Sequence, residues 1–156
     1  MRKFLPWIVV GGLILIVAFW YVNIKNGAVK VNQEVSKEWG NVETAYQRRN
    51  DLIGNLVKTV KGAADFEKST LEAVTNARAS ASQVKIDPSN MTSEQLAQFN
   101  QAQGNLNSSL SRLLLTVENY PDLKANQNFL KLQDELASTE NQILTARTRF
   151  NESVQK

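Results

Sequence analysis

An uncharged, mostly apolar run extends from Phe4 to Val22 and is flanked by Arg2, Lys3 and Lys25. As an α-helix, these residues would extend roughly 28 Å at about 1.5 Å per residue, close to the thickness of the hydrocarbon core of a bilayer. The sequence therefore predicts a transmembrane helix at about residues 4–22, within a membrane anchor of residues 1–27, followed by a second part, residues 28–156.

Aromatic residues lie near both ends of the run, with Trp7 at one end and Trp20 and Tyr21 at the other. Their rings favour the headgroup level of a membrane. The competing interpretation is a cleaved secretory signal, whose apolar stretch is about 7 to 15 residues long and ends in small residues. Here the run is longer and ends in bulky side chains, which favours an uncleaved single-pass anchor.

The net charge of +3 is located at the anchor. The segment from residue 28 onward has 15 basic and 15 acidic residues, because Arg2, Lys3 and Lys25 account for the rest of the 18 basic ones. Nucleic-acid binding depends largely on neutralising phosphates, so we expect no nucleic-acid partner. The compact positive charge before the run favours a cytoplasmic N-terminus and an exported C-terminal domain.

The chain contains no cysteine and no histidine. These absences exclude Ser-His-Asp and Cys-His catalysis, thiolate or imidazole metal sites and redox dithiols. The sequence also has neither a GxxxxGK[ST] nor a GxGxxG phosphate-binding motif. We therefore expect no cofactor, no metal and no enzymatic activity. A hydrolase that uses carboxylates or tyrosine is the remaining enzymatic alternative.

Beyond the anchor, apolar residues recur at the 3–4 spacing of bundle-packing helices. The first such series is Val35, Trp39, Val42, Tyr46, Arg49, Ile53, Leu56, Val60 and Ala63. The second lies between residues 66 and 84 and ends before Asp87-Pro88. The third is Leu96, Phe99, Gln103, Leu106, Leu110, Leu113, Val117 and Tyr120. The fourth is Phe129, Leu132, Leu136, Thr139, Ile143, Ala146 and Phe150.

These series predict an all-α fold, an elongated antiparallel helical bundle with coiled-coil-like packing. No proline lies between Val22 and Val35, so the anchor can continue into the first bundle helix as one rod, with Asn26-Gly27 as a candidate bend. A weak point follows at Gly62, where Asp65 is expected to cap the second helix. Thr92 with Gln95 resembles a capping box for the third.

Arg49, Gln103 and Thr139 are the polar members of otherwise apolar series. A buried guanidinium needs a carboxylate or several carbonyl partners, and Glu118 and Glu140 are the candidates. One interpretation is a structural ion pair that fixes helix register. The other is a polar cleft that binds a ligand or a peptide, lined by Arg49, Arg78, Glu118 and Glu140.

Several segments resemble those of LemA family proteins. They are RRNDLIGNLVKTVKG at residues 48–62, TNARA at residues 75–79 and RLLLTVENYPDLKAN at residues 112–126, continued by Phe129, Leu132-Gln133, Leu136, Thr139-Glu140 and Ala146-Arg147. Two departures are Gly54, where family members usually have proline, and an end at Lys156, where they usually continue.

The resemblance implies a single-pass protein of the bacterial cytoplasmic (inner) membrane with an elongated helical bundle and no established catalytic residues. A related protein of magnetotactic bacteria takes part in building magnetosome membranes. The leading hypothesis is a non-enzymatic, membrane-anchored scaffold that assembles with itself as a homo-oligomer or with other membrane proteins. The alternative is a ligand-binding or signal-sensing module with a polar cleft around Arg49 and Glu118.

Overall fold

The computed structural model describes residues 5–63 and 66–155, and their side chains from residue 11 onward except at residue 28. This part of the chain is helical and contains no strand, so the all-α prediction is confirmed. Its elements are α1 (Leu5–Lys61), α2 (Lys68–Gln83), the 3₁₀ turn η1 (Pro88–Asn90), α3 (Ser93–Val117), α4 (Pro121–Lys124) and α5 (Gln127–Val154).

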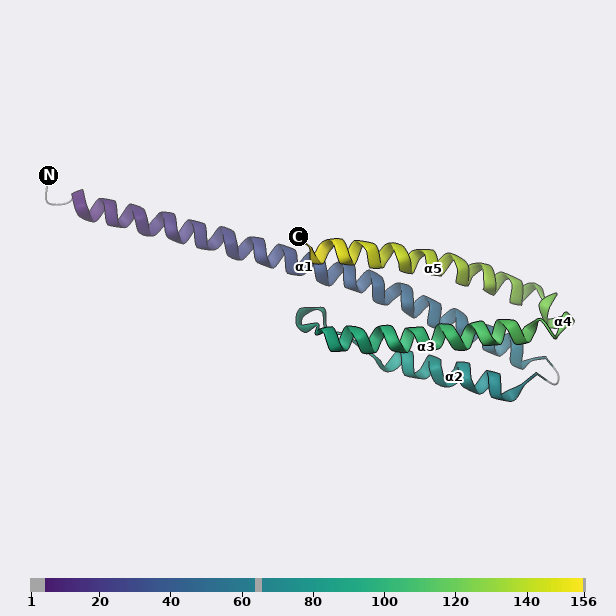
Figure 1. The fold of residues 1–156 in the computed structure, drawn as a ribbon. Helices are drawn as coiled ribbons and strands as arrows, with labels where there is room; N and C mark the ends of the chain where they lie inside the picture. The colour runs from purple at the N-terminus through teal and green to yellow at the C-terminus, as the bar shows by residue number, and fades with distance from the viewer. Residues whose placement is uncertain (1–4, 64–65, 156) are drawn as a thin grey trace.

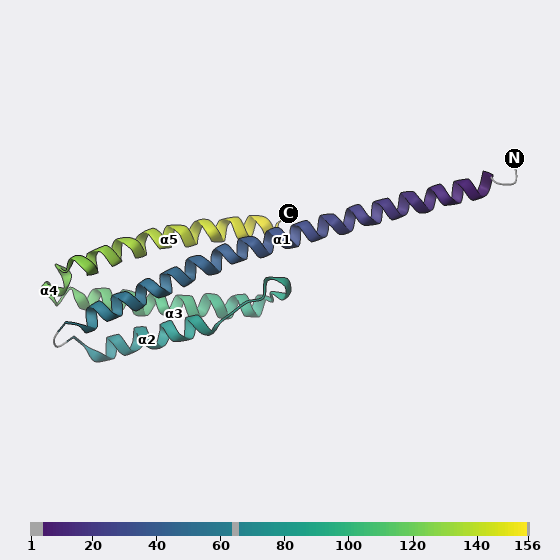
Figure 2. The same cartoon turned by 180° about the vertical axis from the view of Figure 1, so that it is seen from behind.

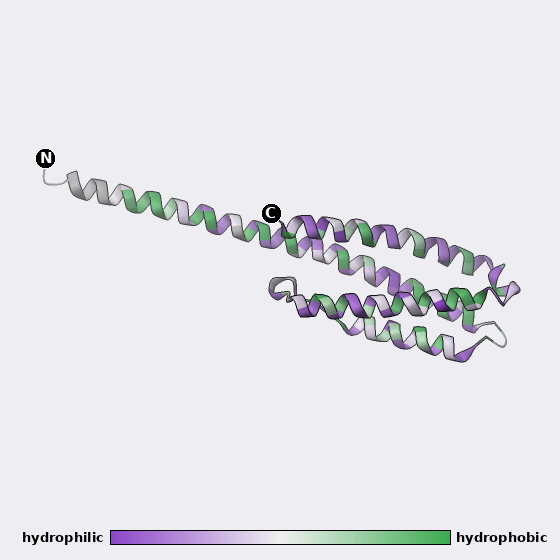
Figure 3. Ribbon diagram, viewed as in Figure 1, coloured by the Kyte–Doolittle hydropathy of each residue, from purple (hydrophilic) through white to green (hydrophobic). Residues whose placement is uncertain are grey.

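Helix α1 is a single rod of 57 residues that leaves the bundle at one end (Figures 1 and 2). Apolar residues recur along its projecting part (Figure 3), and side chains there, such as Leu15 and Phe19, are 72% exposed. Among the described residues, this is the one helix long and apolar enough to cross a membrane. The helix continues through Asn26-Gly27 without a break, so the apolar N-terminal segment and the first bundle helix form one element.

The bundle is built on two closely packed helix pairs, α1 with α5 and α2 with α3. Helix α1 also contacts α2, whereas α3 and α5 approach each other much less closely. Consecutive long helices run antiparallel, and the C-terminal end of α5 lies where α1 leaves the bundle (Figures 1 and 2). The elongated antiparallel arrangement is therefore confirmed, with a wider gap on the α3–α5 side.

The apolar core consists of two clusters along the bundle axis. The cluster near the projecting end of α1 contains Trp39, Tyr46, Phe99, Ile143 and Phe150. Its rings meet edge to face, with centroids 5.4 Å apart for Trp39 and Phe99 and 5.1 Å apart for Trp39 and Phe150, a geometry favoured by aromatic pairs. The cluster at the far end contains buried residues of all four long helices, including Ile53, Val74, Leu113 and Leu136.

The helix starts follow local sequence signals. The Thr92 hydroxyl accepts a hydrogen bond from the Gln95 amide at 3.1 Å, and the Gln95 side chain accepts one from the Thr92 amide at 3.0 Å. The predicted capping box of α3 is thus confirmed. Asn126 caps α5 through its side-chain oxygen. Asp65, predicted to cap α2, lies outside the described residues.

Glu67 occupies the N-cap position of α2. Its carboxylate accepts a hydrogen bond from the Ser69 hydroxyl at 2.6 Å. This hydrogen bond stabilises the ionised form and holds the pKa of Glu67 below its ordinary value. The negative charge also lies at the favourable end of the helix dipole.

Gly54 lies where Arg78 of α2 crosses α1. The Arg78 Nε donates a hydrogen bond to the Asn50 carbonyl oxygen at 2.9 Å. A Cβ atom at position 54 would lie 3.0 Å from the Arg78 Cζ, which is closer than ordinary van der Waals contact. Helix α1 continues through this position to Lys61, so Gly54 accommodates a neighbouring side chain without ending the helix.

We expect Gly104→Ala to stabilise the bundle by about 1 kcal/mol, because it replaces a helical glycine with the best helix former. A Cβ at position 104 would meet nothing within 4 Å. Gly54→Ala should gain clearly less, since Arg78 must move and its hydrogen bond to Asn50 is strained or lost. Thermal unfolding of the two variants measures the difference. Equal stabilisation would show that the contact between Gly54 and Arg78 contributes nothing.

Candidate functional site

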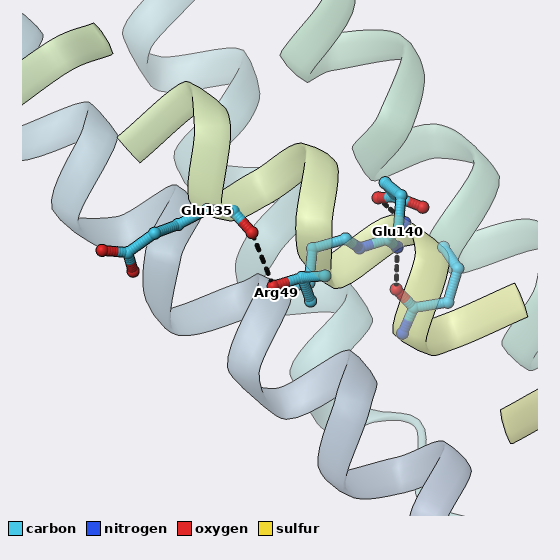
Figure 4. A network of polar contacts seen from close by, with 5 residues as sticks. Arg49, Glu135 and Glu140 are labelled. Carbon is cyan, nitrogen blue, oxygen red and sulfur yellow. Dashed lines mark hydrogen bonds and ion pairs between the residues drawn. The ribbon is translucent and has the colours of Figure 1, made fainter. Parts of the chain in front are cut away.

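Arg49 of α1 connects two other helices in the middle of the bundle. Its Nη1 donates to the Glu140 Oε1 of α5 at 3.0 Å, and its Nη2 donates to the Gln103 Oε1 of α3 at 2.5 Å. Figure 4 shows Arg49 and Glu140 facing each other across the α1–α5 interface. The guanidinium carbon also lies 4.9 Å from the centroid of the Tyr46 ring, a cation–π distance.

The two charges of this pair differ in burial. The Arg49 side chain is 5% exposed, whereas the Glu140 side chain is 46% exposed. Moving an unpaired guanidinium out of water costs several kcal/mol. The hydrogen bonds to Glu140 and Gln103 offset this desolvation cost. The Arg49 Nε has no acceptor among the described residues. The pair therefore consists of a buried cation held by a carboxylate at the surface.

The three polar residues of the apolar series meet at one level of the bundle. Arg49 and Gln103 are hydrogen-bonded, and Thr139 precedes Glu140 on α5, fully buried with its hydroxyl donating to the Glu135 carbonyl at 2.8 Å. In each helix this level separates residues of one apolar cluster from residues of the other. We refer to Arg49, Gln103, Thr139 and Glu140 as the polar layer.

The other two predicted site residues lie elsewhere. Glu118 pairs with Lys124 at the corner between α3 and α4, where both side chains are more than half exposed. It is not the partner of Arg49, because it lies near the far end of α3 while Arg49 contacts the middle of that helix. Arg78 contacts the α1 backbone at Asn50. The structure thus brings Arg49 and Glu140 together, and does not bring Arg78 and Glu118 to them.

A groove on the α3–α5 side reaches the polar layer and contains residues that sequence reasoning did not single out. Its volume is about 550 Å³. Its lining includes Asn100 and Asn107 on α3, together with Leu144 and Arg147 on α5. Asn100, Gln103 and Asn107 follow each other at helical spacing, but this pattern also fits a solvated helix face.

The LemA family model matches residues 38–156, which include the C-terminal part of α1, residues 38–61, and all of the other helices. The chain belongs to the LemA family. The resemblance inferred from residues 48–62 and 112–126 is therefore confirmed.

Curated relatives of this LemA-family chain are bacterial. Protein LemA of Metamycoplasma hominis is 26% identical over 133 residues, which cover 85% of this chain and 57% of the relative. Magnetosome protein MamQ of Magnetospirillum gryphiswaldense is 26% identical over 145 residues, covering 82% of this chain and 53% of the relative. The chain thus spans little more than half the length of these relatives.

No group of three or more acidic, histidine or cysteine side chains that could hold a metal ion occurs among the described residues. The polar layer can hold helices in register and, through the groove, offer hydrogen-bond donors to a ligand. These two capacities correspond to the two functional hypotheses.

Proposed function

We propose that this LemA-family chain is a membrane-anchored, non-enzymatic scaffold that assembles with itself or with other membrane proteins. The observation that supports this proposal is the continuity of α1 from its apolar segment into the bundle. If residues 4–22 span the membrane, residues 23–34 form a helical stalk that places the bundle roughly 18 Å away from the bilayer. A membrane-spanning α1 would orient neighbouring copies in parallel at the same height.

Such parallel alignment favours lateral assembly, because anchored copies have already lost much of the rotational and translational freedom that association costs. The names of the MamQ relatives place those proteins in magnetosomes, which are membrane structures, and this supports a role in membrane organisation. We place this chain in the bacterial cytoplasmic membrane, with the bundle on the exported side.

The test is the mass of the complex extracted in mild detergent, measured by light scattering after size exclusion, with chemical crosslinking in intact membranes. We expect a defined assembly larger than one chain. A matched pair of variants tests the rod: Gly27→Ala keeps the helix, whereas Gly27→Pro breaks it at a cost of about 3 kcal/mol. A Cβ at this position meets nothing within 4 Å.

The assembly should persist in Gly27→Ala and become smaller or heterogeneous in Gly27→Pro, because the bundles then lose their common height and orientation. A monomeric wild-type chain that carries no partner at native expression would contradict the scaffold proposal. An unchanged assembly in Gly27→Pro would show that the rigid connection is not what aligns the bundles.

A further inference from the structure

The groove between α3 and α5 exists because these two helices are the adjacent pair of the bundle that packs least closely. Its floor contains Tyr46 and Arg49 of α1, and its walls are formed by α3 and α5. A volume of about 550 Å³ lies within the range of about 300 to 1,000 Å³ found for small-molecule sites. The size of the groove therefore suits a small ligand.

Two side chains that line this groove, Gln103 and Arg147, have hydrogen-bond donors with no partner among the described residues. Gln103 accepts from Arg49 with its carbonyl oxygen, which leaves its NH₂ group free to donate. Arg49 is more than nine-tenths buried at the floor of the groove, and its Nη atoms are held by Glu140 and Gln103, so it contributes positive charge beneath the groove. Arg147 on the wall forms no ion pair with any described residue. A charged acceptor in the groove could therefore pair with the exposed Arg147 guanidinium and accept from the Gln103 amide.

The groove has a net positive charge, which suits an anionic acceptor. Two guanidinium groups, Arg49 and Arg147, line it together with one carboxylate, Glu140. The Glu140 carboxylate already accepts from Arg49, so the charge of Arg147 is left uncompensated. Guanidinium groups bind carboxylate and phosphate oxygens through paired, charge-assisted hydrogen bonds.

We propose that the α3–α5 groove binds a small oxyanion, the carboxylate or phosphate group of a soluble ligand, with Arg147 as its main contact and the polar layer beneath it. Leu144, which is 66% exposed beside Arg147, offers an apolar surface to the rest of the ligand. This site does not depend on the scaffold proposal, because all of its residues belong to one chain.

The test uses the full chain in detergent, with sodium phosphate and sodium acetate as probes and sodium chloride added to keep the ionic strength constant. Thermal unfolding is followed by tryptophan fluorescence. At 20 mM, a probe with a Kd of about 1 mM should raise the Tm by about 5 °C. A larger effect of acetate would identify a carboxylate site, and a larger effect of phosphate a phosphate site.

Two variants with the same change of charge separate the groove from a general ion effect. Arg147 and Arg149 lie two residues apart on α5, and both are exposed, but Arg149 lines a different groove, between α1 and α5. We expect Arg147→Gln to lose at least half of the Tm shift and Arg149→Gln to retain it. An equal loss in both variants, an unchanged shift in Arg147→Gln, or a wild-type shift below about 1 °C with both probes would overturn the proposal.

Discussion

Substituting both Leu13 and Val17 by arginine is expected to move the chain from the membrane fraction to the soluble fraction. Both residues lie near the middle of the apolar run, and their side chains are 56% and 61% exposed. An arginine at the centre of a membrane-spanning helix costs about 3 kcal/mol on insertion, so two cost about 6 kcal/mol. This corresponds to roughly four orders of magnitude in partitioning.

The measurement is fractionation of cells followed by carbonate extraction of the membranes. The matched control is Leu115→Arg, which introduces the same side chain at a residue of α3 that is 72% exposed. The control should remain in the membrane fraction. Because the described residues of the apolar stretch of α1, from Gly11 onward, are not buried in the structure, the double variant should unfold at nearly the wild-type temperature. Retention of the double variant in membranes would show that another contact anchors the chain.

Local sequence patterns predicted the fold well because each helix here is specified by its own residues. The 3–4 spacing of apolar residues marks the buried faces of α1, α3 and α5, and the described members of these series are buried or half-buried. Thr92 with Gln95 specifies the start of α3 without help from other elements. The continuity of α1 likewise follows from the absence of proline between its two parts.

The same patterns single out Arg49, Gln103 and Thr139 but do not pair them correctly. From the sequence, Glu118 and Glu140 are equivalent candidates for the partner of Arg49. The pairing depends on how α3 and α5 are aligned with α1 along the bundle axis, which the sequence pattern of a single helix does not give. The contact between Gly54 and Arg78 and the separation of α3 from α5 are also tertiary properties. In the sequence, nothing distinguishes Arg147 from the other exposed arginines, because the groove that it lines forms only when α3 and α5 pack in the bundle.

Removing Glu140 should destabilise the bundle more than its partly exposed position suggests. The Arg49 side chain is only 5% exposed, and Glu140→Ala removes the carboxylate that pairs with it. We expect the free energy of unfolding to fall by about 2–3 kcal/mol. Glu118→Ala is the matched control, because its pair with Lys124 joins two side chains that are 58% and 56% exposed. Exposed pairs contribute at most about 1 kcal/mol.

The origin of this cost can be tested by removing the buried charge as well. Methionine is uncharged and unbranched and extends as far as the ε position of arginine, so Arg49→Met eliminates the desolvated cation while filling much of the volume of its stem. The double variant Arg49→Met/Glu140→Ala should therefore be more stable than Glu140→Ala alone, by at least about 1 kcal/mol on this argument. Thermal unfolding of the wild type, Glu140→Ala, Glu118→Ala and the double variant measures these differences. A double variant less stable than Glu140→Ala would contradict this explanation. It would show that the guanidinium stabilises the bundle through Gln103 and Tyr46 even without its carboxylate, so that the polar layer does not depend on the ion pair.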